Sequence, residues 1–330
     1  MKISASIYSN KEKPLEDLIR DLDAHGIDTL HVDCADNDKV FDDIAAIRKF
    51  SSTPIDLHII SSTPEKYLQK IEELKIEYVS FQYENLESIP TLPKNTKTKF
   101  GLSIISSTPL NILDTLKVFP FGEDLDGAFS FIVMMATTPG KSGGAFSREI
   151  FQKIIAFKNR FPQTQIHVDG GVNDEIGFML RLLGVNSIVS GSYLMNHESM
   201  GAGLLSFHKT KTESKSFTIS DFATPVQFLP TLNSNADFKT ILKTIDDFKL
   251  GFVLLVNETG KLEGVVSNAD VRRGLLKNPT DFNLVKTENI VNKNPISIQS
   301  SATLSEMINL VNELNFIVLF LPVVDEKNIL

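Results

Sequence analysis

The chain has 330 residues, of which 42% are hydrophobic, and its 33 Lys and Arg against 41 Asp and Glu give a net charge of −8. This length predicts two domains, and the acidic balance excludes a broad basic surface for binding nucleic acid. The single cysteine, Cys34, excludes an internal disulfide framework and favours a reducing compartment, the cytoplasm. Because no stretch of about 18 apolar residues occurs, we expect neither a membrane span nor an export signal.

Residues 2 to 208 alternate short β-branched runs with longer segments of helical period, which is the pattern of repeated strand–helix units. Eight strands are predicted, at 2–8, 28–34, 55–61, 77–83, 99–105, 128–136, 165–171 and 187–194. Helices are predicted between them at 14–26, 40–50, 64–75, 109–119, 147–161 and 173–184. Eight such units favour an α/β fold closed as a (β/α)8 TIM barrel. The alternative is an open doubly wound sheet, but Ser9 and Asn10 stand where its glycine-rich turn should follow the first strand.

The pattern changes after the barrel region. Residues 209–219 are polar, charged and rich in serine, which predicts a linker between 1–208 and a smaller α+β domain at 220–330. In this second domain we expect a helix at 235–251, strands at 251–257 and 262–267, and a helix at 268–276. Residues 294–330 repeat the early part of this order more weakly, so two packed lobes are predicted, the second of them truncated.

Four polar side chains stand at the predicted carboxyl ends of barrel strands. His31 and Asp33 are two residues apart on one strand and therefore face the same side, and His58 and Asp169 end the third and seventh strands. A closed barrel brings these strand ends around one mouth. Two imidazoles and two carboxylates suit zinc, ferrous iron or manganese better than magnesium or calcium. The alternative is four unrelated polar residues, and His167 is expected to support the site from the same side as Asp169.

Glycine-containing turns follow the last three predicted strands, at 138–146, 169–173 and 190–194. Glycine allows close backbone approach with exposed N–H groups, and barrels often hold phosphate after strands seven and eight. Together the turns predict a phosphate cradle, although each one alone is also typical of an ordinary strand-to-helix turn.

In chain order, the motifs SASIYS, LHVDCAD, DLHII, MMATTPGKSGGAF, HVDGGVN and VSGSYL resemble those of the ribulose-phosphate 3-epimerases over nearly all of residues 1 to 208. The resemblance implies one divalent metal bound by His31, Asp33, His58 and Asp169, with Asp33 and Asp169 also exchanging the proton on opposite faces of the substrate. It implies further substrate contacts and a phosphate site at Ser6, Met135, Gly143, Gly170, Gly171, Gly191 and Ser192.

The activity that the resemblance implies is the 3-epimerisation of a ketose phosphate, ribulose 5-phosphate with xylulose 5-phosphate or a related sugar phosphate, through an enediolate. The chain departs from the family at Ala35 and Ile60, where methionines are usual, and at Lys141, where an aromatic residue is usual. These changes leave the choice of sugar phosphate open. A non-catalytic sugar-phosphate sensor is the main alternative, and another phosphate-binding barrel enzyme, such as one of amino-acid biosynthesis, is disfavoured by the two His and two Asp.

The second domain resembles a pair of cystathionine β-synthase (CBS) modules, most clearly at 253–276. This resemblance implies an adenine nucleotide between the lobes, with Ser267 near its phosphates and Asp270 on its ribose. The alternative is a packing or dimerisation module without a ligand. We expect a homo-oligomer in either case.

Overall fold

The structure is a computed structural model that describes residues 1–10, 12–116, 129–141, 143–208, 217–277, 285–314, 316 and 318–330. The chain divides into two compact units, Met1–Thr212 and Glu213–Leu330. Most of the predicted linker, residues 209–216, lies outside the described ranges. Within those ranges, no helix is both long enough and apolar enough to cross a membrane.

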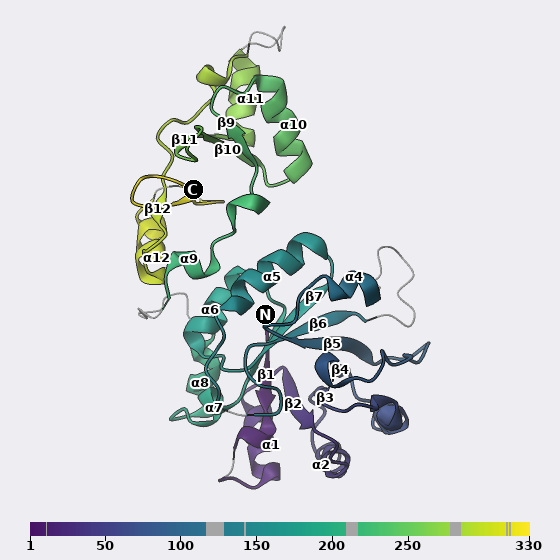
Figure 1. The fold of residues 1–330 in the computed structure, drawn as a ribbon. Coiled ribbons are helices and arrows are strands. Elements are labelled where there is room, and N and C mark those ends of the chain that lie inside the picture. Colours follow the sequence, from purple (N-terminus) through teal and green to yellow (C-terminus); the bar gives the residue numbers. More distant parts are fainter. Residues whose placement is uncertain are drawn as a thin grey trace. The chain divides into compact units, whose positions relative to one another are not determined.

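The first unit is a closed barrel of eight parallel strands in sequence order (Figure 1), as predicted. The strands are β1 Lys2–Ser6, β2 Thr29–Cys34, β3 Ile55–Ile59, β4 Tyr78–Gln82, β5 Lys99–Ile105, β6 Phe131–Met135, β7 Gln165–Asp169 and β8 Ser187–Ser190. Because β8 pairs with β1, the sheet has no free edge, and the ends of all eight strands surround one axis.

Helices follow the strands and cover the barrel. They are α1 Leu15–Ala24, α2 Lys39–Ile47, α3 Leu68–Glu73, α4 Ile112–Leu116, α5 Glu149–Arg160, α6 Asp174–Leu182, α7 Ser192–Met195 and α8 Met200–Ser206. The predicted helices are confirmed with two differences. The 64–75 segment begins as a 3-10 turn, Pro64–Tyr67, and the part of 109–119 beyond Leu116 lies outside the described residues. Helix α6 begins after Asn173, whose side chain accepts a hydrogen bond from the Ile176 N–H and so caps the helix.

The inside of the barrel has an apolar side and a polar side. Phe131, Val133 and Met135 of β6 form a cluster with Tyr78 and Ile105. The inward positions of β1, β2 and β3 are polar instead, and they are joined by hydrogen bonds across the interior. The polar side extends to the carboxyl end of the barrel, where the candidate site lies.

The second unit has a three-stranded sheet in the order β11–β10–β9 and a two-stranded sheet of β12 and β13. Its strands are β9 Thr231–Asn233, β10 Phe252–Val256, β11 Leu262–Ser267, β12 Ile298–Gln299 and β13 Val323–Val324. Its helices are α9 Ile219–Phe222, α10 Phe238–Phe248, α11 Asn268–Lys277 and α12 Leu304–Glu313. The elements predicted between 235 and 276 are confirmed. In the later segment, β12, α12 and the parallel partner β13 follow the same order as β9, α10 and β10, which supports the predicted repeat.

One buried imidazole inside the barrel is held in its neutral form. His167 is 7% exposed and stacks on Phe131 with ring centroids 4.4 Å apart. Burial lowers its pKa to about 4, and the positive charges of Lys2, His31 and Lys99 act in the same direction against an opposing effect of Asp56. The unfolded chain, with a histidine pKa of about 6.5, therefore binds this proton more tightly than the folded protein does.

We predict that His167 makes the protein less stable in mild acid. The contribution of His167 to the free energy of unfolding is complete above its unfolded pKa of about 6.5 and is lost as the pH falls from there towards 4. The loss between pH 7 and pH 5 is about 2 kcal/mol. Urea unfolding at both pH values should show that His167→Gln loses less free energy of unfolding than the unmutated protein, by about this amount. Equal losses in the two proteins would contradict the assignment.

Candidate functional site

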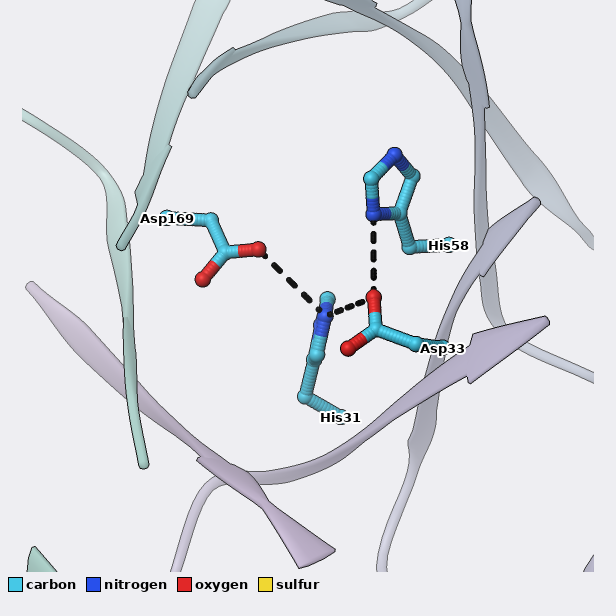
Figure 2. A group of neighbouring side chains, drawn as sticks. All are labelled: His31, Asp33, His58 and Asp169. Atoms are coloured by element: carbon cyan, nitrogen blue, oxygen red, sulfur yellow. Dashed lines mark hydrogen bonds and ion pairs between the residues drawn. The ribbon is translucent and has the colours of Figure 1, made fainter. Parts of the chain in front are cut away.

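Four side chains converge at the carboxyl end of the barrel (Figure 2). His31 and Asp33 come from β2, His58 from β3 and Asp169 from β7, and one ligand atom of each lies within 4.8 Å of the others. The residues that the sequence placed at separate strand ends are therefore brought together. Asp33 lies between the two imidazoles, and Asp169 approaches His31 from the other side of the mouth (Figure 2).

The strand register explains this arrangement. Asp33 of β2 pairs directly with His58 of β3, so the two inward side chains stand at the same height. Asp33 Oδ1 lies 3.1 Å from His58 Nδ1 and 3.4 Å from His31 Nε2, and Asp169 Oδ2 lies 3.6 Å from His31 Nε2. These contacts connect three strands through one small polar cluster.

Two further residues, Asp56 and Gln82, hold the imidazoles from behind. His31 Nδ1 lies 3.0 Å from Asp56 Oδ2, and His58 Nε2 lies 2.8 Å from Gln82 Oε1. Both oxygens accept hydrogen bonds, so each ring donates from its rear nitrogen and turns its other nitrogen towards the cluster. The sequence analysis missed both residues. The strand period places Asp56 on the same side as His58, two residues later, but it does not show which residue of a neighbouring strand Asp56 or Gln82 contacts.

The donor set fits a divalent transition metal. The cluster-facing nitrogens of His31 and His58, in their unprotonated form, and the oxygens of Asp33 and Asp169 are ligand types that zinc, iron and manganese accept. Metal-bound histidines usually donate their other N–H to a carboxylate or carbonyl oxygen, as both rings do here. One ligand atom of each residue already lies within 4.8 Å of the others, so a single ion could be held by all four.

The two site carboxylates have different proton affinities. Burial alone would raise the pKa of Asp33, but the imidazoles of His31 and His58 more than offset this and hold the pKa below its ordinary range. At Asp169 burial prevails and raises the pKa to about 6. A pair of carboxyl groups whose environments separate their pKa values is suited to acid and base roles on one substrate.

A cavity of about 410 Å³ opens beside the cluster. All the residues predicted as substrate and phosphate contacts line it: Ser6, Met135, Gly143, Gly170, Gly171, Gly191 and Ser192. Lys141 is the only lysine or arginine among the described residues that line this cavity.

Glycine is required at two of these positions. A Cβ on Gly170, whose φ is +108°, would overlap Thr137, and a Cβ on Gly171, whose φ is +64°, would overlap the backbone of Gly144 and Phe146. The backbone at these turns can therefore approach a bound group closely, as a phosphate cradle requires.

The two residues predicted to bind a nucleotide, Ser267 and Asp270, cap helix α11 in the second unit. Asp270 Oδ2 accepts hydrogen bonds from Ser267 Oγ at 2.6 Å and from the Ser267 N–H at 2.9 Å. Asp270 also pairs with Arg273. The structure thus gives both residues a local structural role, whether or not they bind a ligand.

The fold and the site define a TIM barrel with a His/Asp cluster at its carboxyl end, and a second unit follows it in the chain. The model of the ribulose-phosphate 3 epimerase family matches residues 2–195, and the chain belongs to this family. Residues 219–277 match the CBS domain. Family membership confirms the predicted class of enzyme, an isomerase of the epimerase type.

Similar proteins cover the two parts of the chain separately. The ribulose-phosphate 3-epimerase of Bacillus subtilis is 27% identical over 206 residues, which span 58% of this chain and 91% of that protein. The ribulose-phosphate 3-epimerase of Buchnera aphidicola is 27% identical over 221 residues, or 62% of this chain and 93% of that protein. The CBS-pair protein CBSX2 from Arabidopsis thaliana is 24% identical, with a TM-score of 0.30, and the match covers 34% of this chain and 84% of CBSX2.

We predict that Asp56→Asn weakens binding of a divalent metal by about 10- to 100-fold, because the neutral amide holds the His31 ring less firmly and no longer increases its basicity. The measurement is a competition between the protein and a chelator for added zinc or manganese. Ser4→Ala is the matched control, since Ser4 Oγ donates to the same Asp56 oxygen without touching His31. Unchanged affinity in Asp56→Asn would show that His31 does not need this partner.

Proposed function

We propose that the barrel is a divalent-metal-dependent 3-epimerase of a ketose phosphate, with ribulose 5-phosphate and xylulose 5-phosphate as the first pair to test. The observation that supports this most directly is the position of Asp33 and Asp169 around His31 beside a glycine-lined cavity. A divalent cation held by His31, Asp33, His58 and Asp169 would supply Lewis-acid stabilisation of the negative charge that develops on the substrate oxygens.

The two aspartates divide the proton transfer between them. One carboxylate removes the proton from C3, and the electron pair of the broken C–H bond moves into the enediolate across C2 and C3. The other aspartate, in its acid form, donates a proton to the opposite face of C3. The configuration at C3 is then inverted and the two side chains have exchanged protonation states, so the reverse reaction uses them in the opposite roles.

The phosphate of the substrate is assigned to the glycine turns. Gly143, Gly170, Gly171, Gly191 and Ser192 are proposed to bind it largely through backbone N–H groups. Lys141 adds an ammonium group to the same cavity, which favours a phosphorylated sugar over a neutral one.

We predict that Asp169→Asn slows inversion at C3 of the ketose phosphate by about 10²- to 10⁴-fold, because an amide cannot carry the proton on its face of the substrate. Asp33→Asn should have a similar effect. Asp38→Asn, which changes an exposed aspartate paired with Lys70, is the control and should invert C3 at the normal rate. The readout in heavy water is the formation of the C3 epimer with deuterium at C3. If the unmutated, metal-loaded protein exchanges no ketose phosphate, the catalytic proposal fails and the sensor alternative is favoured.

We further propose that the CBS domain binds an adenine nucleotide and thereby regulates the barrel. Support comes from the match of residues 219–277 to the CBS domain and from Ser267 and Asp270 at the start of α11. In this proposal Asp270 accepts hydrogen bonds from the ribose hydroxyls in addition to capping the helix.

We predict that AMP, ADP or ATP raises the melting temperature by mass action, with about 2.7 kcal/mol of stabilisation at a hundredfold excess over the dissociation constant. Asp270→Ala should abolish this shift. Because the same substitution removes a helix cap, Glu306→Ala is the matched control, since Glu306 caps α12 in the same unit. A nucleotide shift that persists in Asp270→Ala, or is absent from the unmutated chain, would contradict the proposed contact.

A further inference from the structure

A second polar cavity lies inside the barrel at its amino-terminal end, away from the His/Asp cluster. Its volume is about 170 Å³, and its walls include Lys2, Thr29, Tyr78, Lys99 and His167. Lys2 and Lys99 begin β1 and β5, and Thr29 begins β2. Since a water molecule needs about 10 to 15 Å³ of such space, the cavity has room for a small solute.

Two ammonium groups stand at this cavity. Lys2 Nζ lies 5.2 Å and Lys99 Nζ 5.8 Å from the centre of the Tyr78 ring, and Lys2 Nζ donates a hydrogen bond to the Tyr78 hydroxyl at 3.0 Å. Neither lysine forms an ion pair with a carboxylate of the described residues. Because both stems are flexible and both groups flank one ring, they can converge on one anion.

Among the described residues of the wall, Asp56 is the one carboxylate. Its Oδ2 accepts a hydrogen bond from Ser4 Oγ at 3.0 Å and lies 3.0 Å from His31 Nδ1, so its contacts are with partners inside the barrel. Lys2 and Lys99 supply the positive charge that a ligand in this cavity would meet.

We propose that this cavity binds a small dianionic oxyanion, a phosphate group, through the ammonium groups of Lys2 and Lys99. The site is separate from the sugar-phosphate cavity and does not take part in epimerisation. By connecting the amino ends of β1 and β5, a bound phosphate stabilises the barrel. The ligand is either free inorganic phosphate or the phosphate of a small ester.

The test is a calorimetric titration of the full-length protein with inorganic phosphate and, separately, with glycerol phosphate. The double variant Lys2→Met/Lys99→Met should lose one of two phosphate-binding events per chain, or bind there about 10- to 100-fold more weakly, as expected for lost hydrogen bonds to charged groups. Lys97→Met is the matched control, because it removes an exposed lysine two residues from Lys99 and should leave both events in place.

Binding of inorganic phosphate identifies the free ion, and binding of glycerol phosphate alone identifies an ester. The proposal is overturned if the double variant and the unmutated protein give the same isotherms with both ligands, or if neither ligand binds at this end. Epimerase activity is measured in parallel and should be unchanged in the double variant. Failure of the catalytic proposal would therefore be recognised separately from failure of this one.

Discussion

Closure of the sheet is the constraint on which the site depends. His31 and Asp169 are far apart in the chain, and they meet only because β8 returns to pair with β1 and the strand ends form a ring. Closure also sends alternate side chains of every strand into the interior, where polar groups have little access to water. Each polar residue that faces inward therefore needs a partner on another strand, and the contacts between β1, β2, β3 and β4 are those partners.

These contacts leave the interior short of positive charge. Three carboxylates, those of Asp33, Asp56 and Asp169, contact only two imidazoles, and burying unpaired charge is costly. Proton uptake by His31 is one remedy. Burial lowers the pKa of His31, but the three carboxylates outweigh this effect and raise the pKa, so the ring can carry a positive charge. A divalent cation is a second remedy and would use the same atoms. The electrostatics of the cluster and its proposed metal chemistry thus have one origin.

The sequence predicted the barrel and the four clustered residues because both depend on local periodicity: strand period, strand ends and the i, i+2 spacing of His31 and Asp33 are visible in a single chain. Asp56 and Gln82 were missed for the opposite reason. Their roles depend on which residue of a neighbouring strand stands beside them, and that register is a property of the closed sheet. Ser267 and Asp270 show a second limit of prediction from sequence. The motif that suggests ligand binding also forms hydrogen bonds with backbone N–H groups at the start of a helix, so the sequence alone does not separate the two roles.

The two ends of a parallel barrel offer an anion different chemistry. At the carboxyl end, strands lead into helices through short turns, so exposed N–H groups and helix amino termini are available and glycine is enough to bring them close to a phosphate. At the amino end the chain enters the strands from helix carboxyl ends, whose partial charge is negative. An anion there must be held by side chains, and full positive charges are needed to overcome the unfavourable dipoles. Lys2 and Lys99 at the first positions of β1 and β5 meet this requirement, whereas the cavity at the carboxyl end is lined by glycines and contains Lys141 as its one lysine among the described residues.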